Sequence, residues 1–452
     1  MELKDLFLTP IYLAIFYGIA FAVRRRYTNA LTKKYFIPAL SVKFLGAIAL
    51  GLIYQFYYSG GDTFNYYNHV KVIYEAFTNS PIIGLKLIFS HGQYDPLTSA
   101  YAARMEWYRA PTEFFVIKIA AICAIFCFNT YSVIALMFAA LSFAGMWAMY
   151  LTFLRIFPLA YKKTAIAVFF LPSVFFWGSG LMKDSLCIGA LGWTFYGFYH
   201  LLIAKRYILT ASIIGAFGIY IIVSVKVYIL LSFMPPALLW VFNENNQRIK
   251  SASIRVLLKP FFILLGVVAG YLGATNLTAG DERYDVDKIG ERTKINSDYL
   301  TKQVANGSAY NIGTIDGSLG SLVTVAPQAV IVSLFRPFLF EARNPVMVLS
   351  ALEAALFLYL TVTLFYKTGI IKSFKLIASE PIISFCFIFS IILAVGVGTN
   401  SGNFGTLVRY KIPLMPFFLA ALYIMQYKAT AAKSKPRQVK SVRNVRRLAV
   451  TE

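Results

Sequence analysis

Long apolar runs separated by short polar connectors are the dominant pattern of this chain. A helix needs roughly 20 consecutive apolar residues to cross a bilayer. Runs near that length occur at 6–23, 36–57, 131–153, 185–203, 206–224, 225–242, 346–366, 382–398 and 410–427. Two shorter runs, 164–178 and 261–275, are also expected to cross. The pattern predicts an all-α integral membrane protein with about eleven transmembrane helices.

Composition supports this class. The 452 residues are 58% hydrophobic, 17% aromatic and only 14% charged, and the mean hydropathy is +0.65. These values lie well beyond the balance of soluble globular proteins. The continuous runs also exclude an outer-membrane barrel, whose strands are about half as long and alternate in polarity.

The distribution of basic residues predicts the orientation. The net charge is +23, but Lys and Arg collect in the connectors at 24–34, 155–163, 205–206, 248–259 and 367–375 and in the tail 428–447. This is the positive-inside pattern, so no nucleic-acid partner is expected. The loops 58–130, 178–184, 223–227, 276–345 and 399–409 then face outward, with the N-terminus outside and the tail in the cytoplasm. We expect a multi-pass protein of a bacterial cytoplasmic membrane.

Two further apolar segments are expected not to cross. Residues 112–127 carry Lys118 near their middle, and residues 328–340 are interrupted by Arg336 and Pro337. Both fit helices that lie in the outer interface, where long basic side chains reach water. If either one crossed, half of the topology would be inverted.

These assignments divide the chain into regions. An extra N-terminal helix with its basic loop covers 1–35, and a transmembrane core that includes the outer loop 58–130 covers 36–275. The large outer loop 276–345 is predicted to hold a short helix and then a lid-like stretch rich in Gly, Ser and Asn. Transmembrane helices at 346–427 and the basic tail 428–452 complete the chain.

Acidic residues interrupt the apolar runs at two outer positions. Asp62 follows the second run, and the next predicted helix places Tyr66 and His69 on one face. Asp62 either caps that helix or serves as a general base toward a hydroxyl. Lys183 and Asp184 occupy a short turn between apolar runs, where charges are costly unless they are paired or hydrated. They either cap and snorkel or take part in chemistry.

Basic candidates lie on the same predicted side. Lys226, nearly surrounded by apolar residues, either snorkels or meets a lipid phosphate as a point charge. Arg409 and Tyr410 begin the last run, and Arg336 precedes Glu341. Either arginine could bind a phosphate in a bidentate manner. Glu353 falls inside a run, where it pairs within the bundle or lines a polar path.

Sequence signatures of cofactor chemistry are missing. The chain contains no phosphate-binding glycine loop, zinc signature or nucleophile elbow, and its four cysteines lie in apolar runs without metal-ligand spacing. No cofactor is predicted. Carboxylates of the outer loops could hold a divalent metal, but no ligand spacing supports one. Activated substrate must therefore arrive already in the membrane.

The order of these clusters resembles the GT-C glycosyltransferases, multi-spanning enzymes that transfer a sugar from a polyprenyl-phosphate carrier at the outer or lumenal face. The resemblance covers residues 36–240 and the last span. It rests on Asp62 after an early span, a Pro-led segment and helix pair at 111–154, the run 171–184 ending in Asp184, the Gly-containing span 215–226 ending in Lys226, and Arg409-Tyr410 before Pro413 and Pro416. Asp62-Thr63 stands where many members have an acidic pair, helix 6–23 is additional, and the 334–341 segment has no assigned counterpart.

The resemblance implies a mechanism. A lipid phosphate would lie between Lys226 and Arg409, with Lys183 or Arg336 assisting. Asp62 would orient or deprotonate the acceptor hydroxyl, and Asp184 would position Lys183 or the acceptor. The implied partners are a polyprenyl-phosphate-linked sugar donor, a glycan, lipid or protein acceptor, and membrane lipids.

Two other classes stay open. A surface-polysaccharide polymerase, like an O-antigen polymerase, would use the same carrier and face but transfer a whole oligosaccharide. A lipid-linked substrate transporter or flippase is favoured by Glu353 and by the number of spans. Such a transporter should show a central polar path or paired interrupted helices, and neither is plain in this sequence.

Overall fold

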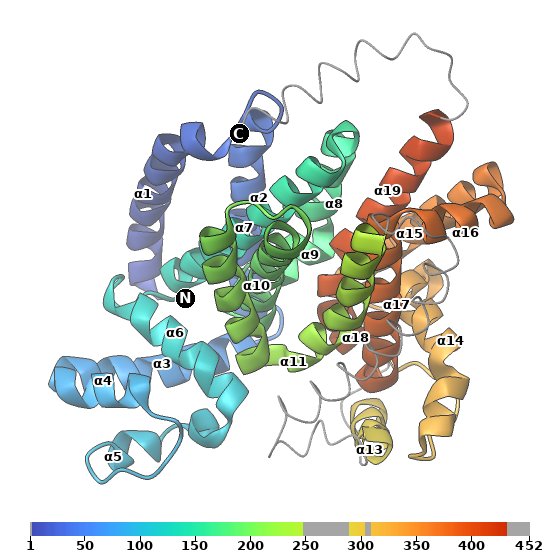
Figure 1. The fold of residues 1–452 in the computed structure, drawn as a ribbon. Coiled ribbons are helices and arrows are strands. Elements are labelled where there is room, and N and C mark those ends of the chain that lie inside the picture. The colour runs from blue at the N-terminus through green and yellow to red at the C-terminus, as the bar shows by residue number, and fades with distance from the viewer. Residues whose placement is uncertain (1, 247–288, 303–308, 432–452) are drawn as a thin grey trace.

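The computed structural model describes residues 2–246, 289–302 and 309–431, and the regular secondary structure of this part of the chain consists of helices and one isolated bridge between Ala309 and Asn403. Figure 1 shows the helices as a bundle. The α-helices are α1 (Leu3–Tyr27), α2 (Lys33–Phe56), α3 (Asp62–Asn79), α4 (Pro81–Phe89), α5 (Ser99–Ala102), α6 (Pro111–Ile125), α7 (Tyr131–Ile156), α8 (Tyr161–Phe169), α9 (Pro172–Trp177), α10 (Lys183–Phe198), α11 (Ile208–Asn246), α13 (Ile289–Lys302), α14 (Leu319–Phe335), α15 (Pro345–Thr368), α16 (Ile370–Ser379), α17 (Pro381–Ser401), α18 (Phe404–Tyr410) and α19 (Met415–Ala431).

Eight helices of the described residues are long and apolar enough to cross a membrane. They are α1, α2, α7, α10 with its π-helical extension, α11, α15, α17 and α19. The chain is therefore a multi-pass helical membrane protein, as the hydrophobic pattern predicted.

The difference between eight spans and the predicted eleven has three sources. Helix α11 bends at Lys226, whose φ of −145° and ψ of 73° are not helical. Its two arms correspond to the predicted spans 206–224 and 225–242, and Figure 1 shows them side by side, joined at the bend. The predicted span 164–178 forms α8 and α9, because Pro172 cannot continue a helix without losing a backbone hydrogen bond. The predicted span 261–275 lies outside the described residues.

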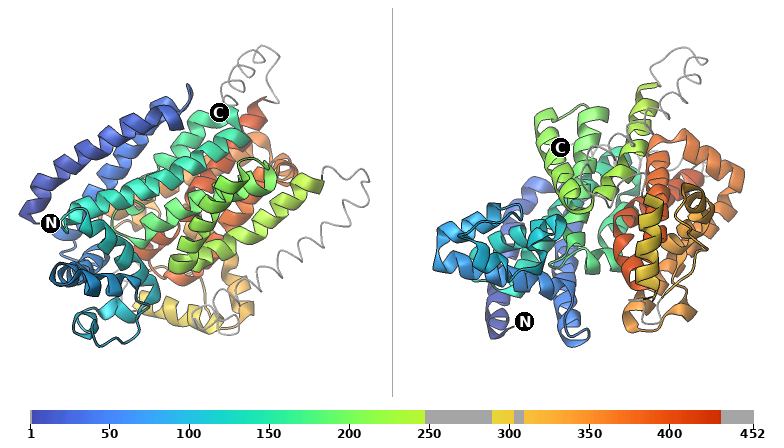
Figure 2. Two further views of the ribbon diagram at one scale, coloured as in Figure 1. Left: turned by 60° about the vertical axis from the view of Figure 1, so that its left-hand side comes forward. Right: turned by 90° about the horizontal axis from the view of Figure 1, so that it is seen from below.

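The helices are arranged across the bundle roughly in the order of the sequence. Figure 2 shows the N-terminal helices on one side, the C-terminal helices on the other, and the helices from α7 to α11 between them. Along this order Asp62 follows α2, Asp184 lies at the start of α10, and Arg409 precedes α19.

Different polar contacts lie at the two ends of the bundle. At one end, called here the α3 end, α2 finishes, α3, α7 and α10 begin, and the Thr63 and Tyr131 hydroxyls are 2.8 Å apart. At the opposite end, Lys163 donates to the side chain of Gln426 over 2.5 Å, and Lys428 pairs with Glu380. Lys163 and Lys428 thus lie at the end of the bundle opposite Asp62 and Asp184.

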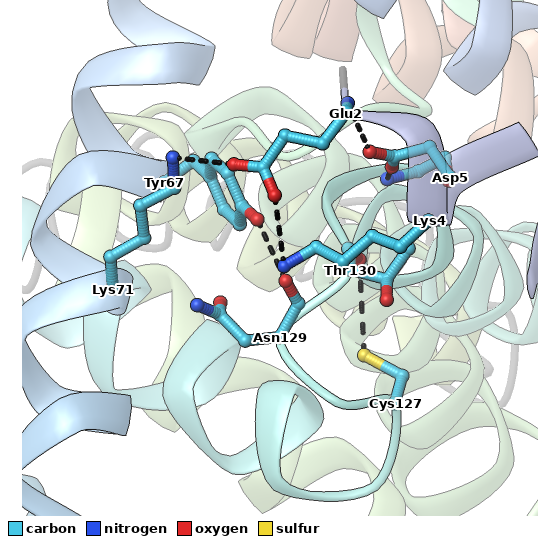
Figure 3. Close-up of polar contacts among 9 residues, drawn as sticks. Glu2, Lys4, Asp5, Tyr67, Lys71, Cys127, Asn129 and Thr130 are labelled. Atoms are coloured by element: carbon cyan, nitrogen blue, oxygen red, sulfur yellow. Dashed lines mark hydrogen bonds and ion pairs between the residues drawn. The ribbon is translucent and has the colours of Figure 1, made fainter.

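The N-terminal helix is attached at the α3 end (Figure 3). An Asp5 carboxylate oxygen accepts from the Ser132 amide over 2.7 Å, which caps α7 from another helix. Glu2 pairs with Lys4 at 3.1 Å and with Lys71 of α3 at 2.9 Å. The start of α1 therefore lies beside α3 and the turn before α7.

The two segments predicted to lie in the interface are both helical. Segment 112–127 corresponds to α6, which is shorter than a span, and its Lys118 donates to the Ser90 carbonyl over 3.0 Å. Residues 328–335 form the second half of α14, which begins at Leu319 and ends before Arg336, and a separate 3₁₀ turn covers Leu339–Glu341. Helix α14 packs along α17, where the Ser333 hydroxyl donates to the Ala394 carbonyl over 2.8 Å.

The large loop contains the predicted short helix, α13, followed by a stretch attached to α17. The Tyr310 hydroxyl donates to the Gly398 carbonyl over 3.0 Å, and the Tyr310 amide donates to the Gly402 carbonyl over 3.2 Å. The part of the lid-like stretch that is described is thus held against the end of a membrane helix at this tyrosine.

Small residues bring the central helices into backbone contact. A Cβ added at Gly145 of α7 would lie 1.9 Å from the Gly189 carbonyl oxygen of α10, and one added at Gly192 would lie 2.0 Å from the Gly145 oxygen. Such close approach is typical of membrane helix pairs, whose stability comes from packing. The α7–α10 contact fixes the helix that carries Asp184.

We expect Gly145→Ala to destabilise the protein by roughly 1–3 kcal/mol, because the added methyl group would force α7 and α10 apart. Gly396→Ala in α17 is the matched control, since a Cβ there meets nothing within 4 Å. Thermal unfolding in detergent should show a lower midpoint for Gly145→Ala and an unchanged or higher one for the control. Equal midpoints for the two variants would contradict the close α7–α10 contact.

Candidate functional site

Four charged side chains alternate in sign at the α3 end. Arg409 lies 2.8 Å from Asp62 (Nη1 to Oδ2) and 3.5 Å from Asp184 (Nε to Oδ2). The other Asp184 oxygen is 2.5 Å from the Lys226 ammonium nitrogen. These four residues, in the spatial order Asp62, Arg409, Asp184 and Lys226, are called here the charged chain. They join α3, α18, α10 and α11.

Local structure explains how these residues meet. Asp62 is the first residue of α3, Asp184 is the second residue of α10, and Lys226 sits at the bend of α11. Each position is a helix start or break, where a side chain can point along the bundle axis instead of outward to lipid. Arg409 is next to the end of α18, shortly before the last span.

Aromatic rings support the two cations of the charged chain. The Lys226 ammonium lies 4.6 Å from the centre of the Tyr410 ring, and the Arg409 guanidinium lies 5.7 Å from the Trp177 ring. Cations over aromatic faces are stabilised by the ring quadrupole, most strongly where water is excluded. Tyr410, a predicted substrate-binding residue, therefore contacts the site through Lys226.

Burial divides the two carboxylates. The Asp184 side chain is 2% exposed and is enclosed by its two cations, whereas the Asp62 side chain is 45% exposed. A buried ion pair is costly to break because the remaining charge has no water. Asp184 is thus placed to hold the cations in position, and Asp62 is the carboxylate of the chain that an external hydroxyl can reach.

A second ion pair lies beside the charged chain. The Lys183 ammonium bonds to Glu113 of α6 and to the Thr112 hydroxyl, the latter at 2.9 Å. Burial alone would raise the pKa of the Glu113 carboxyl, but the nearby Lys183 ammonium outweighs this effect, so the pKa is lowered. The Glu113 carboxyl is therefore ionised at neutral pH, and its negative charge balances the positive charge of Lys183.

Sequence reasoning did not select Glu113. The available signal was an acidic residue in the first turn of a Pro-led apolar helix, a position that the helix dipole favours. Only the fold places that turn next to Lys183.

Tyr66 and His69 share one face of α3, as predicted, and both pack on Trp107. Their ring centres lie 4.9 Å and 5.2 Å from that of Trp107. Burial, and then the carboxylates of Glu113 and Asp62, raise the pKa of Tyr66, so its hydroxyl keeps its proton. Tyr66 lies within the electrostatic reach of the site, while the described ring contact of His69 is with Trp107.

Arg336 is the predicted site residue that the structure places elsewhere. Its guanidinium binds the Glu341 carboxylate in a bidentate manner, with an Nε to Oε2 distance of 3.0 Å, and lies 5.2 Å from the Phe404 ring centre. Its carbonyl oxygen accepts from Lys411 over 3.1 Å. Arg336 thus ties the end of α14 to the start of the last span.

An apolar cavity of about 360 Å³ lies among α4, α6, α7, α10 and α11. Phe115 and Leu186 contribute to its wall, and they follow Thr112 and Lys183 by three residues each, so they lie on the helix faces that carry the Lys183–Thr112 contact. Lys118 and His91 are its basic lining residues. The cavity therefore begins close to the second ion pair and is lined mostly by side chains compatible with a hydrocarbon chain.

Metal binding has no structural support in the part of the chain that is described. Within residues 2–246, 289–302 and 309–431, no group of three or more His, Cys, Asp or Glu side chains is arranged to hold a metal ion.

Comparisons with known proteins give no relative. No family model matches the chain, and no curated protein or solved structure matches it either. Its eight apolar helices make it a multi-pass helical membrane protein, and its charged chain runs from the exposed Asp62 to the buried Asp184 and Lys226.

We expect Asp184→Asn to destabilise the protein by about 3–5 kcal/mol, because Lys226 would stay buried without its counter-ion. Asp62→Asn should cost about 0–1 kcal/mol, as for an exposed ion pair. Denaturant unfolding in detergent would measure both variants. A difference of less than about 1 kcal/mol would show that Asp184 does not carry the buried pairing.

Proposed function

We propose that this protein is a membrane glycosyltransferase of the GT-C type that moves a sugar from a polyprenyl-phosphate carrier to an acceptor. The observation that carries the proposal is the accessible Asp62 carboxylate, bonded to the first cation of a chain that leads into the membrane. A carboxylate beside cations at a bilayer end is suited to transfer from a lipid-linked phosphate.

The chemistry follows from these groups. Asp62 accepts the proton of the acceptor hydroxyl, while the oxygen of that hydroxyl forms a bond to the anomeric carbon of the sugar. The bond from that carbon to the carrier phosphate breaks, and the phosphate leaves with an added negative charge. Fixed cations in a partly dehydrated site stabilise this charge without reorganisation.

Burial ranks the cations for phosphate contact. Lys226 is 9% exposed and is paired with Asp184, whereas Arg409 and Lys183 are 21% and 17% exposed. Arg409 and Lys183 are therefore the better candidates for direct contact with the phosphate. Lys226 and Asp184 then keep Arg409 in place.

The apolar cavity supports a lipid-linked donor. It begins near Glu113 and Lys183 and runs between helices of the bundle, with a volume of about 360 Å³. The first isoprene units of a carrier could occupy it while the phosphate remains at the ion pairs. A water-soluble nucleotide sugar has no hydrocarbon chain that could occupy such an apolar cavity.

Orientation and location are part of the proposal. The basic connectors at the opposite end support a cytoplasmic placement there, so the α3 end would face outward from a bacterial cytoplasmic membrane. Transfer at that face would serve the synthesis of cell-surface glycans or glycolipids.

Purified protein incubated with a panel of radiolabelled polyprenyl-phosphate sugars tests the function. We expect Asp62→Asn to lower transfer by about 100- to 10,000-fold, the usual contribution of a general base. Its expression and thermal midpoint should stay close to those of the unsubstituted protein.

Glu75→Gln is the matched control, because Glu75 is a similarly exposed carboxylate of α3 that pairs with Arg104 at 2.7 Å. Transfer should persist in this variant. Turnover retained by Asp62→Asn would remove Asp62 from the mechanism, and the absence of transfer from every donor would contradict the glycosyltransferase. A ladder of long products would instead favour the polymerase.

A further inference from the structure

Helix α9 is held at its C-terminal end by a lysine that lies within the membrane. Lys43, in the interior of the span α2, is fully buried, and its ammonium nitrogen donates to the Gly178 carbonyl that follows α9. The Ser142 hydroxyl of α7 donates to the same carbonyl over 2.8 Å. No carboxylate of the described residues forms an ion pair with Lys43.

The N-terminal end of α9 is held by a buried acid. Glu353, in the span α15, is almost completely buried, and one carboxylate oxygen accepts from the Ser173 amide over 2.8 Å. Ser173 is the second residue of α9. Two ionisable side chains from helices far apart in the sequence thus contact opposite ends of one short helix.

The signs of these contacts match the helix. Unpaired amides give the N-terminal end of a helix a partial positive charge, and unpaired carbonyls give the C-terminal end a partial negative charge. Glu353 and Lys43 complement both ends. Ionisable residues inside a membrane bundle are costly and are usually retained for function, so their joint use on a six-residue helix needs an explanation beyond packing.

Helix α9 leads directly into the candidate site. Its last residue, Trp177, carries the ring below the Arg409 guanidinium, and the turn after it ends at Lys183 and Asp184. Close packing against α2 also holds the middle of α9, because a Cβ at Gly46 of α2 would lie 2.0 Å from the Phe175 carbonyl oxygen. A shift of α9 would therefore move Trp177, the aromatic support of Arg409, and the start of the turn that leads to Lys183 and Asp184.

We propose that Lys43 and Glu353 are positioning residues that fix α9 from both ends and thereby set Trp177 and the Lys183–Asp184 turn. Neither residue contacts substrate. They act through the backbone of α9, and their effect on transfer, unlike their effect on the turn, rests on the proposed function.

Hydrogen exchange measured by mass spectrometry tests the effect on the turn without any activity. In Lys43→Met, a variant of similar length without a donor, amides 178–182 should exchange about tenfold faster, as the loss of a hydrogen bond from a charged group predicts. Glu353→Leu should have a similar effect, whereas Glu353→Gln keeps an acceptor for Ser173 and should stay within about twofold of the original rate.

Lys163→Met is the matched control, because that ammonium bonds to Gln426 at the opposite end of the bundle. Its exchange at 178–182 should be unchanged. Folded Lys43→Met and Glu353→Leu proteins that exchange like the original would overturn the proposal. If Lys43→Met fails to fold, Ser142→Ala and the comparison of Glu353→Leu with Glu353→Gln test the proposal instead. Ser142→Ala weakens the C-terminal contact of α9 and Glu353→Leu the N-terminal one, and Lys43 is present in both.

Transfer kinetics provide the second readout. We expect Glu353→Leu to lower kcat about tenfold with the donor KM within twofold, and Glu353→Gln to restore kcat, because only the geometry of the reacting groups changes. Equal kcat in the two variants would contradict positioning. If the original protein transfers no sugar, the proposed function fails, while the exchange experiment still decides the role of Lys43 and Glu353.

Discussion

The site depends on one buried carboxylate. Asp184 lies between the Lys226 ammonium and the Arg409 guanidinium, so it joins the bend of α11 and the end of α18 to the start of α10. None of these charges is stable alone in a bilayer. Because both pairings share Asp184, the bend and the approach to the last span are coupled to a single side chain.

Burial separates the charges that build the site from those that could react in it. Lys43, Glu353 and Asp184 are enclosed by helices and by their own partners, and their role is geometric. Asp62 and Lys183 keep some contact with solvent, and Leu186 of the apolar cavity follows Lys183 by one helical turn. The proposed transfer reaction needs both groups, because exposed charges relax in water unless something rigid holds them.

Particular residues show where prediction from the sequence ended. Asp62, Asp184, Lys226 and Arg409 interrupt apolar runs, which is a local signal, and the structure brings these four together. Arg336 gives the same signal but lies with its neighbour Glu341. Glu113 and Lys43 were not selected from the sequence, because a first-turn acid is common at helix starts and a lysine inside a span does not reveal which group it meets. Their significance comes from contacts between distant segments.

The sequence by itself determined the class of the protein, most of its membrane helices and the grouping of basic residues in short connectors. These features follow from the thickness of the bilayer and the cost of moving charge across it, which act on each segment separately. Only the tertiary structure decided which charges pair, that α8 and α9 replace one predicted span, and that two buried residues hold α9. Pairing depends on which helices become neighbours, and neighbours are chosen by side-chain packing over the whole bundle.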